Sequence, residues 1–355
     1  MNAPAPLSGL SIRTADLADP GEFARIDGFV RSTPGSSIFH RPQWSRAVEL
    51  GSGQRAHYLV AECGGAITGC LPLSEIRSRL FGNAMVSTGF GTGGGVLAES
   101  VETRESLAEA AWALTLGRGC TGLELRGGEL PGGWEPRSGV YANFSRELSA
   151  DADALLAAIP RRQRADVRKA RAHGLEVSFG ADERHRAAHY RVYAESVRNL
   201  GTPVYPRSLF DAALDQLGAE AEVMLVSLGG RPLSSMLCFL ADDTIQPYWG
   251  GGTGDARRWH ANDLAYFAMM CRGIERGCSY ADFGRSKVGT GPWARKRFWG
   301  FDEQPLVYGL RTIDGRQARE INPQNARFRL KVAAWQRLPL PIANRLGPII
   351  ARGLG

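Results

Sequence analysis

YLVAECGGAITGCLPL (residues 58–73) and MLVSLGGRPLSSMLCF (residues 224–239) align without a gap at an offset of 166 residues. In each stretch an apolar run leads into a Gly-Gly pair and a second apolar run, which is the pattern of a β-hairpin. Four positions are identical, because Leu59, Val60, Gly64 and Leu71 coincide with Leu225, Val226, Gly230 and Leu237. The sequence therefore predicts the same pair of strands in two places.

A second match follows in the same order along the chain. RGCTGLEL (118–125) aligns with RGCSYADF (276–283) at an offset of 158 residues. Each copy follows an apolar pattern with helical spacing that ends on glycine, SLAEAAWALTLGRG in the first and NDLAYFAMMCRGIERG in the second. Two ordered matches indicate duplication. We predict an α/β (α+β) fold of two tandem domains, each a mixed central sheet flanked by helices.

The segment between the two copies marks the boundary. DADALLAAIPRRQRADVRKARAHGLEV (151–177) contains a proline break at Pro160, a basic amphipathic helix, a glycine stop at Gly174 and the start of a strand. We predict an N-terminal domain over residues 9–150, a catalytic C-terminal domain over 151–320, and a basic amphipathic segment over 321–355.

Composition narrows the class of protein. The 355 residues contain no apolar run of the roughly 18–20 residues that span a bilayer, and the N-terminus lacks the pattern of a secretory signal. The six cysteines include no CxxC pair. We expect them to be reduced and the protein to be cytoplasmic, with peripheral contact at the inner membrane as an open alternative.

The net charge of +7 is unevenly distributed. Residues 311–355 hold nine Lys/Arg against two acidic residues, and residues 161–172 hold six against one. Such blocks suit phosphates, nucleic acid or anionic lipid headgroups, and solvated helix faces are the alternative.

The stretch ADFGRSKVGTGPWARKRFWGF (281–301) combines four glycines, five basic residues and large aromatic side chains. We predict a cationic, flexible turn that holds an anionic substrate, with a solvated surface turn as the alternative. Lys296 is the candidate catalytic cation, either at a carbonyl oxygen that becomes negative or at a donor phosphate. Five further side chains are assigned to substrate binding: Arg285, Lys287, Trp293, Arg295 and Arg297. Gly289 and Gly291 allow the main chain to approach a cofactor.

Other candidates lie outside this stretch. Gly250, Gly251, Gly252 and Thr253 precede a helix predicted near Asn262, where main-chain N–H groups favour a cofactor phosphate; a plain bend is the alternative. Tyr248 and Trp249 either line the acceptor groove or fill the core. Asp282 is a candidate base, and its repeat partner Glu124 favours a structural position instead. Arg198 and Arg207 are candidate ligands of a substrate phosphate.

A metal site is not expected. His185 and His189 are spaced i, i+4, but no third ligand accompanies them, and we predict that both are exposed on a helix.

Several stretches resemble the Fem-type (FemAB) transferases and their BioF2-like acetyltransferase relatives, which are built from GNAT domains. They are RKARAHGLEV (168–177), YWGGGTGDARRWHAND (248–263), YADFGRSK (280–287) and KRFWGF (296–301). FHRPQW, SVRNLGTPVYPR, PYWGGGT, DFGRSKVGTGP and LPLPIANRLGPIIARGLG, beginning at residues 39, 196, 247, 282 and 338, resemble FemAB-like proteins of exosortase/PEP-CTERM exopolysaccharide clusters.

The resemblance implies transfer of an acyl or aminoacyl group to an amine, with acyl-CoA or aminoacyl-tRNA as the donor and no tightly bound cofactor. In Fem proteins a Phe-Lys pair follows the DFG-like strand; Lys296 matches the lysine, while Arg295 stands in place of the phenylalanine. The expected acceptor is a phosphate-bearing precursor of the cell envelope or of an exopolysaccharide, and tRNA is a partner if the donor is aminoacyl-tRNA.

Two alternatives stay open. Residues 326–355 either lie at a membrane interface or dock on their own domain. The whole protein is either this transferase or a non-catalytic basic adaptor of an envelope or exopolysaccharide assembly system, which binds polyanions without consuming a donor.

Overall fold

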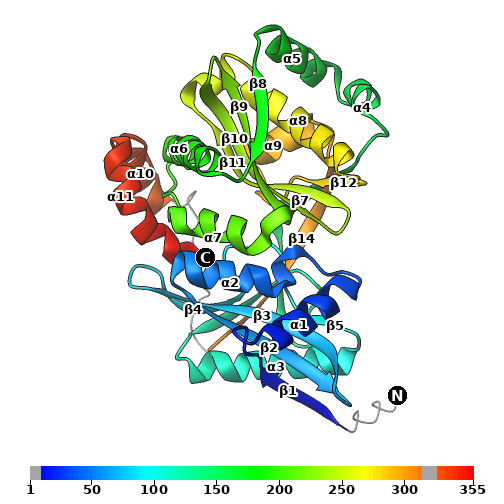
Figure 1. Ribbon diagram of the computed structural model, residues 1–355. Helices are drawn as coiled ribbons and strands as arrows, with labels where there is room; N and C mark the ends of the chain where they lie inside the picture. Colours follow the sequence, from blue (N-terminus) through cyan, green and yellow to red (C-terminus); the bar gives the residue numbers. More distant parts are fainter. Residues whose placement is uncertain (1–8, 314–325) are drawn as a thin grey trace. The chain divides into compact units, whose positions relative to one another are not determined.

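Both predicted hairpins form in the computed structural model, which describes residues 9–313 and 326–355 (Figure 1). Strand β2 (Arg55–Cys63) pairs antiparallel with β3 (Ala66–Ser78), and β9 (Ala221–Leu228) with β10 (Arg231–Ala241). All four turn glycines have positive φ, from 53° to 84°, in the left-handed region that tight hairpin turns require.

The second match in the sequence is also structural. Helix α3 (Val101–Gly117) leads into β6 (Gly122–Arg126), and α8 (Ala261–Glu275) leads into β12 (Tyr280–Asp282). In each copy this last strand pairs parallel with the strand that follows the hairpin, β6 with β4 and β12 with β11. The predicted α/β class, with a mixed sheet flanked by helices, is confirmed.

The chain divides into two compact units. Among the described residues, unit 1 comprises 9–138, 307–313 and 352–355, and unit 2 comprises 139–306 and 326–351. The predicted boundary at residue 320 lies outside the described residues, and the predicted division at residue 150 stays a prediction.

Unit 1 is a sheet with helices on both faces. Its strands follow the order β1-β2-β3-β4-β6-β14, and β5 pairs with β3. Helix α3 packs Leu107 and Ala111 onto one face, while α1 places Ile26 and Val30 beside the other. Its further elements are β1 (Leu10–Thr14), α1 (Pro20–Ser32), η1 (Ile38–His40), α2 (Pro42–Ser52), β4 (Gly82–Ser87), β5 (Leu97–Ala98) and η4 (Arg352–Leu354).

The sheet of unit 1 contains a buried carboxylate, that of Glu75 on β3. The Glu75 side chain is 1% exposed and contacts His57 Nε2 at 3.0 Å, Arg77 Nε at 2.5 Å and Arg118 Nε at 2.8 Å. Burial alone would raise the pKa of this carboxyl group. The three hydrogen bonds outweigh burial and lower the pKa to about 2, so Glu75 is ionised at neutral pH.

Unit 2 contains the second copy of the repeat, with strand order β7-β12-β11-β10-β9-β8, and β13 pairs with β7. Two strands, β7 (Glu135–Glu147) and β14 (Asp302–Thr312), contribute residues to both units. The remaining elements are α4 (Ala152–Ala158), α5 (Arg161–Ala172), β8 (Glu176–Gly180), α6 (Glu183–Asn199), α7 (Arg207–Leu217), η2 (Gly218–Glu220), β11 (Thr244–Gly252), η3 (Gly254–Arg257), β13 (Ser286–Lys287), α9 (Gly291–Phe298), α10 (Ala326–Gln336) and α11 (Leu340–Ala351).

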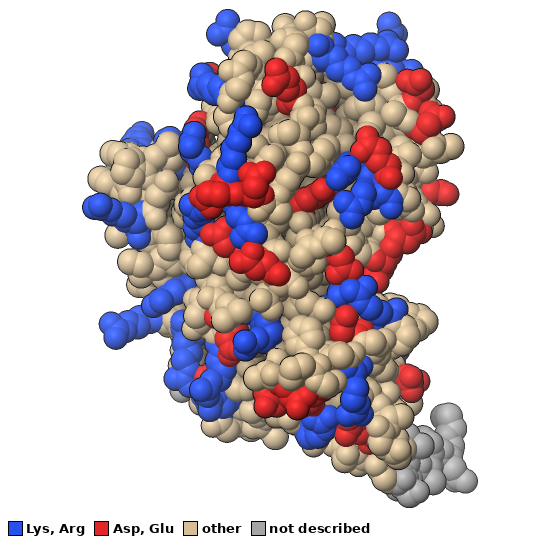
Figure 2. Space-filling view, in the orientation of Figure 1, with Lys and Arg blue, Asp and Glu red and all other residues tan. Residues whose placement is uncertain are grey.

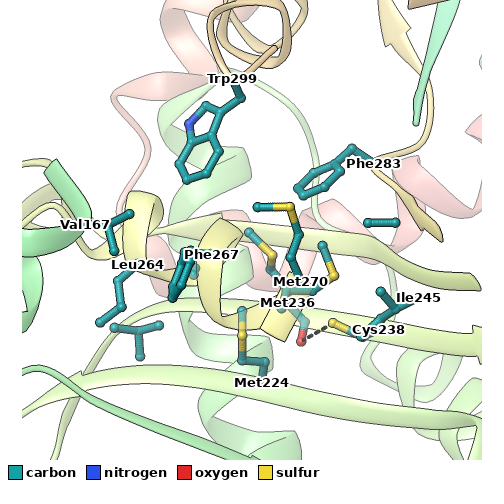
Figure 3. Close-up of a cluster of buried hydrophobic side chains, with 14 of the residues drawn as sticks. Val167, Met224, Met236, Cys238, Ile245, Leu264, Phe267, Met270, Phe283 and Trp299 are labelled. Carbon is teal, nitrogen blue, oxygen red and sulfur yellow. Dashed lines mark hydrogen bonds between the residues drawn. The ribbon is translucent and has the colours of Figure 1, made fainter. Parts of the chain in front are cut away.

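Helix α8 covers one face of this sheet. Met224, Met236 and Cys238 point from β9 and β10 toward Phe267 and Met270 of the helix (Figure 3). Because side chains alternate along a strand, the intervening residues face the other way. His189 of α6 bonds Ser235 Oγ at 2.8 Å from that opposite face. His189 is 1% exposed, so the prediction that it lies on an exposed helix face is wrong.

Two predictions for the C-terminal part of unit 2 are corrected or refined. Residues 291–298 form helix α9, not a flexible turn, and Pro292 lies in its first turn, where a missing N–H is tolerated. Helices α10 and α11 pack against α6, so residues 326–351 do dock within their own unit. Among the described residues, no helix is both long and apolar enough to cross a membrane.

Candidate active site

A cleft of about 940 Å³ opens in unit 2. Its walls come from α5, α6, β11, α8 and α9, and from the loop after β12. The cleft begins where two parallel strands separate. Strand β11 pairs with β12 only at Thr244 and Ile245, but it stays paired with β10 as far as Gly252. The edge of β11 beyond Ile245 therefore faces the cleft, where Pro247, Tyr248 and Gly250 line it.

Strand β11 is irregular at this point. Leu237 of β10 pairs with Trp249 and the next residue, Cys238, pairs with Pro247, so Tyr248 is the extra residue that forms a bulge in β11. Bulges interrupt the ladder and redirect side chains, and they are frequent beside active sites. Tyr248 lines the cleft, whereas Trp249 is 5% exposed, does not line it, and packs against Phe210 with ring centroids 4.8 Å apart.

The glycine run predicted to bind a cofactor phosphate lines the cleft at Gly250, Gly251 and Gly252. These glycines are required by close packing. A Cβ on Gly251 would lie 2.2 Å from Ser196 Oγ, and one on Gly252 would lie 2.5 Å from Asn262 Oδ1. Thr253 does not line the cleft, and its main-chain N–H donates to Leu233 O at 2.8 Å.

Lys296 lines the cleft and is 7% exposed. Its Nζ donates to the main-chain carbonyls of Phe283 at 2.5 Å, Gly284 at 2.9 Å and Arg285 at 3.4 Å. Burial lowers the pKa of Lys296 to about 8, although the nearby Asp282 carboxylate acts in the opposite direction. In this conformation its three ammonium hydrogens hold the loop after β12 in place.

Asp282 is close to the cleft in sequence, but its side chain is bonded to other residues of unit 2 and does not line the cleft. Its carboxylate accepts hydrogen bonds from Asn143 Nδ2 at 3.0 Å, Gln246 Nε2 at 3.1 Å and the Gly284 N–H at 2.7 Å. Burial raises its pKa. Asp282 does not line the cleft, so its carboxylate is placed to order the loop rather than to contact a ligand directly.

The cations predicted from the 281–301 stretch separate into two groups. Arg285 and Arg295 line the cleft. Arg297 and Trp293 do not: both contact Glu303, and the guanidinium of Arg297 lies 4.7 Å from the Trp293 ring centroid. Of the other residues predicted here, Gly291 lines the cleft, and Lys287 and Gly289 lie outside its lining.

Arg198 and Arg207 also lie outside the lining of the cleft. Arg198 Nη1 donates to Gln336 O of α10 at 3.0 Å, and Arg207 forms an ion pair with Glu183 at 2.6 Å. Both side chains therefore contact other parts of unit 2.

The cleft contains a polar cluster that the sequence analysis did not single out. His260 Nδ1 lies 3.5 Å from Asp166 Oδ1 and 3.9 Å from Asp263 Oδ2, and all three residues line the cleft. His260 has φ of 54°, a left-handed conformation that is rare for non-glycine residues and is concentrated at functional sites. Two of the three residues occur in the quoted motif YWGGGTGDARRWHAND, but Asp166 is 94 positions from His260.

The ligand atoms of this cluster lie within 4.8 Å of one another, a spacing that a metal ion could bridge. Both carboxylates already have cationic partners. Asp263 Oδ1 pairs with Arg295 Nη2 at 2.7 Å, and Asp166 Oδ1 pairs with Lys169 Nζ at 3.3 Å. This charge balance suits an imidazole whose Nδ1 faces carboxylates better than a divalent ion, which would compete with Arg295.

The part of the chain that forms the cleft matches a known class. Residues 161–295 match the family model described as "Acetyltransferase (GNAT) domain". This match covers less than half of the chain and contains α5, β11, α8 and the loop after β12. No curated protein matches the chain.

Solved structures share the fold over most of the chain. The crystal structure of FemX is similar, with a TM-score of 0.64 and 15% sequence identity over 84% of this chain and 96% of the FemX chain. The C-terminal domain of a putative lysylphosphatidylglycerol synthetase from Agrobacterium fabrum has a TM-score of 0.56 and 12% sequence identity, over 83% of this chain and 92% of that domain. A "Tandem GNAT protein from the clavulanic acid biosynthesis pathway" has a TM-score of 0.52 and 12% sequence identity, over 87% of this chain and 100% of that chain.

Proposed function

We propose that the cleft of unit 2 transfers an acyl group from a coenzyme A thioester to an amine. The observation that carries this proposal is the opening between β11 and β12, which lies within the residues that match the GNAT acetyltransferase domain. Domains of this class use acyl-CoA as a co-substrate. The lining supplies guanidinium groups for phosphates at Arg285 and Arg295 and an exposed strand edge for the thioester carbonyl.

In the proposed reaction the amine nitrogen forms a bond to the thioester carbonyl carbon, and the C–S bond breaks. Negative charge collects on the carbonyl oxygen, and the proposal assigns its stabilisation to the main chain of β11 beyond Ile245, the part of this strand that β12 does not pair with. His260 accepts the proton that the amine loses, with Asp166 and Asp263 orienting the imidazole through Nδ1. His260 then gives up this proton to solvent and the departing sulfur takes one from solvent, so coenzyme A leaves as the thiol.

Lys296 is assigned a positioning role. Its three contacts with carbonyls fix the loop that carries Arg285, so the lysine acts on the donor through that loop. The acceptor in this proposal is an amine on an envelope or exopolysaccharide precursor, and the exosortase/PEP-CTERM context belongs to the same proposal. Its support is the set of sequence stretches that resemble the FemAB-like proteins.

Donor binding is the first test. Titration calorimetry with coenzyme A and acetyl-CoA is expected to show binding that weakens by about tenfold in Arg285→Ala, because one charge-assisted contact is lost. Arg184→Ala, at an exposed α6 residue away from the cleft, is the matched control and is expected to bind as the wild type does. If neither compound binds the wild-type protein, the coenzyme A proposal is wrong.

Thiol release with a panel of amines then tests turnover. His260→Gln is expected to lower kcat by about 10²–10⁴-fold while the KM for acyl-CoA stays unchanged, because the lost group acts on the proton and not on the donor. A charged aminoacyl-tRNA is tested in parallel. Consumption of aminoacyl-tRNA without thiol release from acyl-CoA would assign the alternative donor, and consumption of neither would favour the non-catalytic adaptor.

A further inference from the structure

Helix α11 presents two different faces. Ala343, Gly347 and Ala351, spaced i, i+4 and i+8, are buried. A Cβ on Gly347 would lie 2.9 Å from Val204 Cγ1 and 3.0 Å from Val204 N, so the helix backbone approaches the rest of unit 2 closely on this face. Packing therefore fixes which side of α11 faces inward.

The outward face is apolar. Ile342, Leu346 and Ile349 are 46%, 44% and 64% exposed, and their i, i+4, i+7 spacing places them in one stripe. Leu330 on α10 is 83% exposed. Four large aliphatic side chains on two consecutive helices are more than the scattered exposed residues that surfaces normally carry.

The charged residues of α10 and α11 all have one sign. Lys331, Arg337 and Arg345 are exposed on or next to α10 and α11, and residues 326–355 contain no aspartate or glutamate. Figure 2 shows blue atoms beside broad tan surface over these helices, whose place is given by their labels in Figure 1. The apolar stripe and the cations of these two helices together complement a partner that is both apolar and anionic, as an anionic lipid bilayer is.

We propose that α10 and α11 form an interfacial docking surface for an anionic lipid bilayer. The aliphatic stripe of α11 lies among the acyl chains near the headgroups, and the neighbouring cations contact lipid phosphates. Neither helix crosses the bilayer, because α10 has only 11 residues and α11 only 12. This surface is separate from the lining of the cleft, so the proposal is independent of the proposed transferase activity.

Sedimentation of the full chain with vesicles tests the proposal. The wild-type protein is expected to sediment with vesicles of phosphatidylcholine and phosphatidylglycerol (7:3) and to remain in solution with phosphatidylcholine alone. Binding is expected to fall when NaCl is raised from 0.1 to 0.5 M, since the cations act through a screened field. Arg337→Gln/Arg345→Gln is expected to weaken binding to the anionic vesicles at low salt.

The triple variant Ile342→Ser/Leu346→Ser/Ile349→Ser is expected to reduce the partition coefficient at least tenfold. Val101→Ser/Leu116→Ser changes two exposed apolar residues of α3 and is expected to bind as the wild type does. Thermal unfolding of each variant separates loss of binding from loss of folding. If the folded triple variant binds as strongly as the wild type, or if the wild type binds no anionic vesicles, the proposal is overturned. A change in solution mass of the triple variant without any vesicle binding would instead assign the stripe to a protein interface.

Discussion

Replacing Lys296 by methionine tests whether burial lowers the pKa of the most buried cation in the cleft. The lysine is 7% exposed, and burial lowers its pKa to about 8 from 10.5. Its folded-state pKa therefore lies below its unfolded value. Where the pH lies between the two values the unfolded chain binds more protons, so the stability of the wild type rises with pH. Below pH 8 the lysine is protonated in both states and its destabilising contribution is fully present.

The magnitude follows from the two pKa values. Between pH 7 and pH 9.5 the wild type is expected to gain about 2 kcal/mol of unfolding free energy relative to Lys296→Met. Methionine retains most of the side-chain length and does not titrate, so the difference between the two proteins isolates the lysine. Other groups that titrate in this range cancel when the two proteins are compared.

Urea unfolding at pH 7, 8 and 9.5 measures the difference in unfolding free energy between the wild type and Lys296→Met. Lys169→Met removes a lysine whose side chain is 60% exposed on α5 and is the control for the loss of a lysine side chain. If the difference in unfolding free energy between the wild type and Lys296→Met does not change with pH, burial does not set the pKa of this lysine. It would also remove the basis for treating the ammonium as held inside the protein.

Three further outcomes follow from the contacts described above. Glu75→Gln is expected to cost about 3 kcal/mol in urea unfolding at pH 7, because it leaves the cations around it uncompensated. The folded-state pKa of Glu75, about 2, is below its unfolded value, so its stabilising effect is present above about pH 4.5. The difference in unfolding free energy between the wild type and Glu75→Gln should therefore shrink as pH falls from 5 toward 3. A constant difference would contradict the lowered pKa of Glu75. Gly251→Ala is expected to lower stability by about 1–3 kcal/mol because the new methyl group meets Ser196. Adding Ser196→Gly should recover part of that loss, apart from the roughly 1 kcal/mol cost of glycine in a helix; no recovery would place the strain elsewhere. Asp263→Asn is expected to lower thiol release in the transferase assay less than His260→Gln does, since Asp166 still faces the imidazole; an equal loss would show that Asp263 acts directly.

The repeat was predictable because its signals are local. Glycine pairs with positive φ fix both hairpin turns, and the apolar runs on either side define the strands. The end of α5 at a glycine was likewise readable, since the helix stops at Ala172 and Gly174 takes a φ of 72°. These elements are determined by residues within a few positions of one another.

The candidate site was only partly predictable. Lys296, Arg285 and Arg295 could be identified because charge and aromatic residues concentrate in one short stretch. The cluster around His260 depends on a contact between α5 and the start of α8, and no local pattern encodes that pairing. Helix α9 was missed because eight residues rich in cations and aromatics carry a weak helical signal, and its contacts with the rest of unit 2 decide the conformation.

In the duplicated order of elements, the segment between β4 and α3 of unit 1 corresponds to the segment between β11 and α8 of unit 2. A single methyl group on Gly95 would lie 1.9 Å from the carbonyl oxygen of Gly127. Any side chain at residue 95 therefore requires movement of the backbone. Laboratory evolution of the proposed donor preference is therefore best aimed at the second copy of the duplicated fold, where side chains that line the cleft can be exchanged.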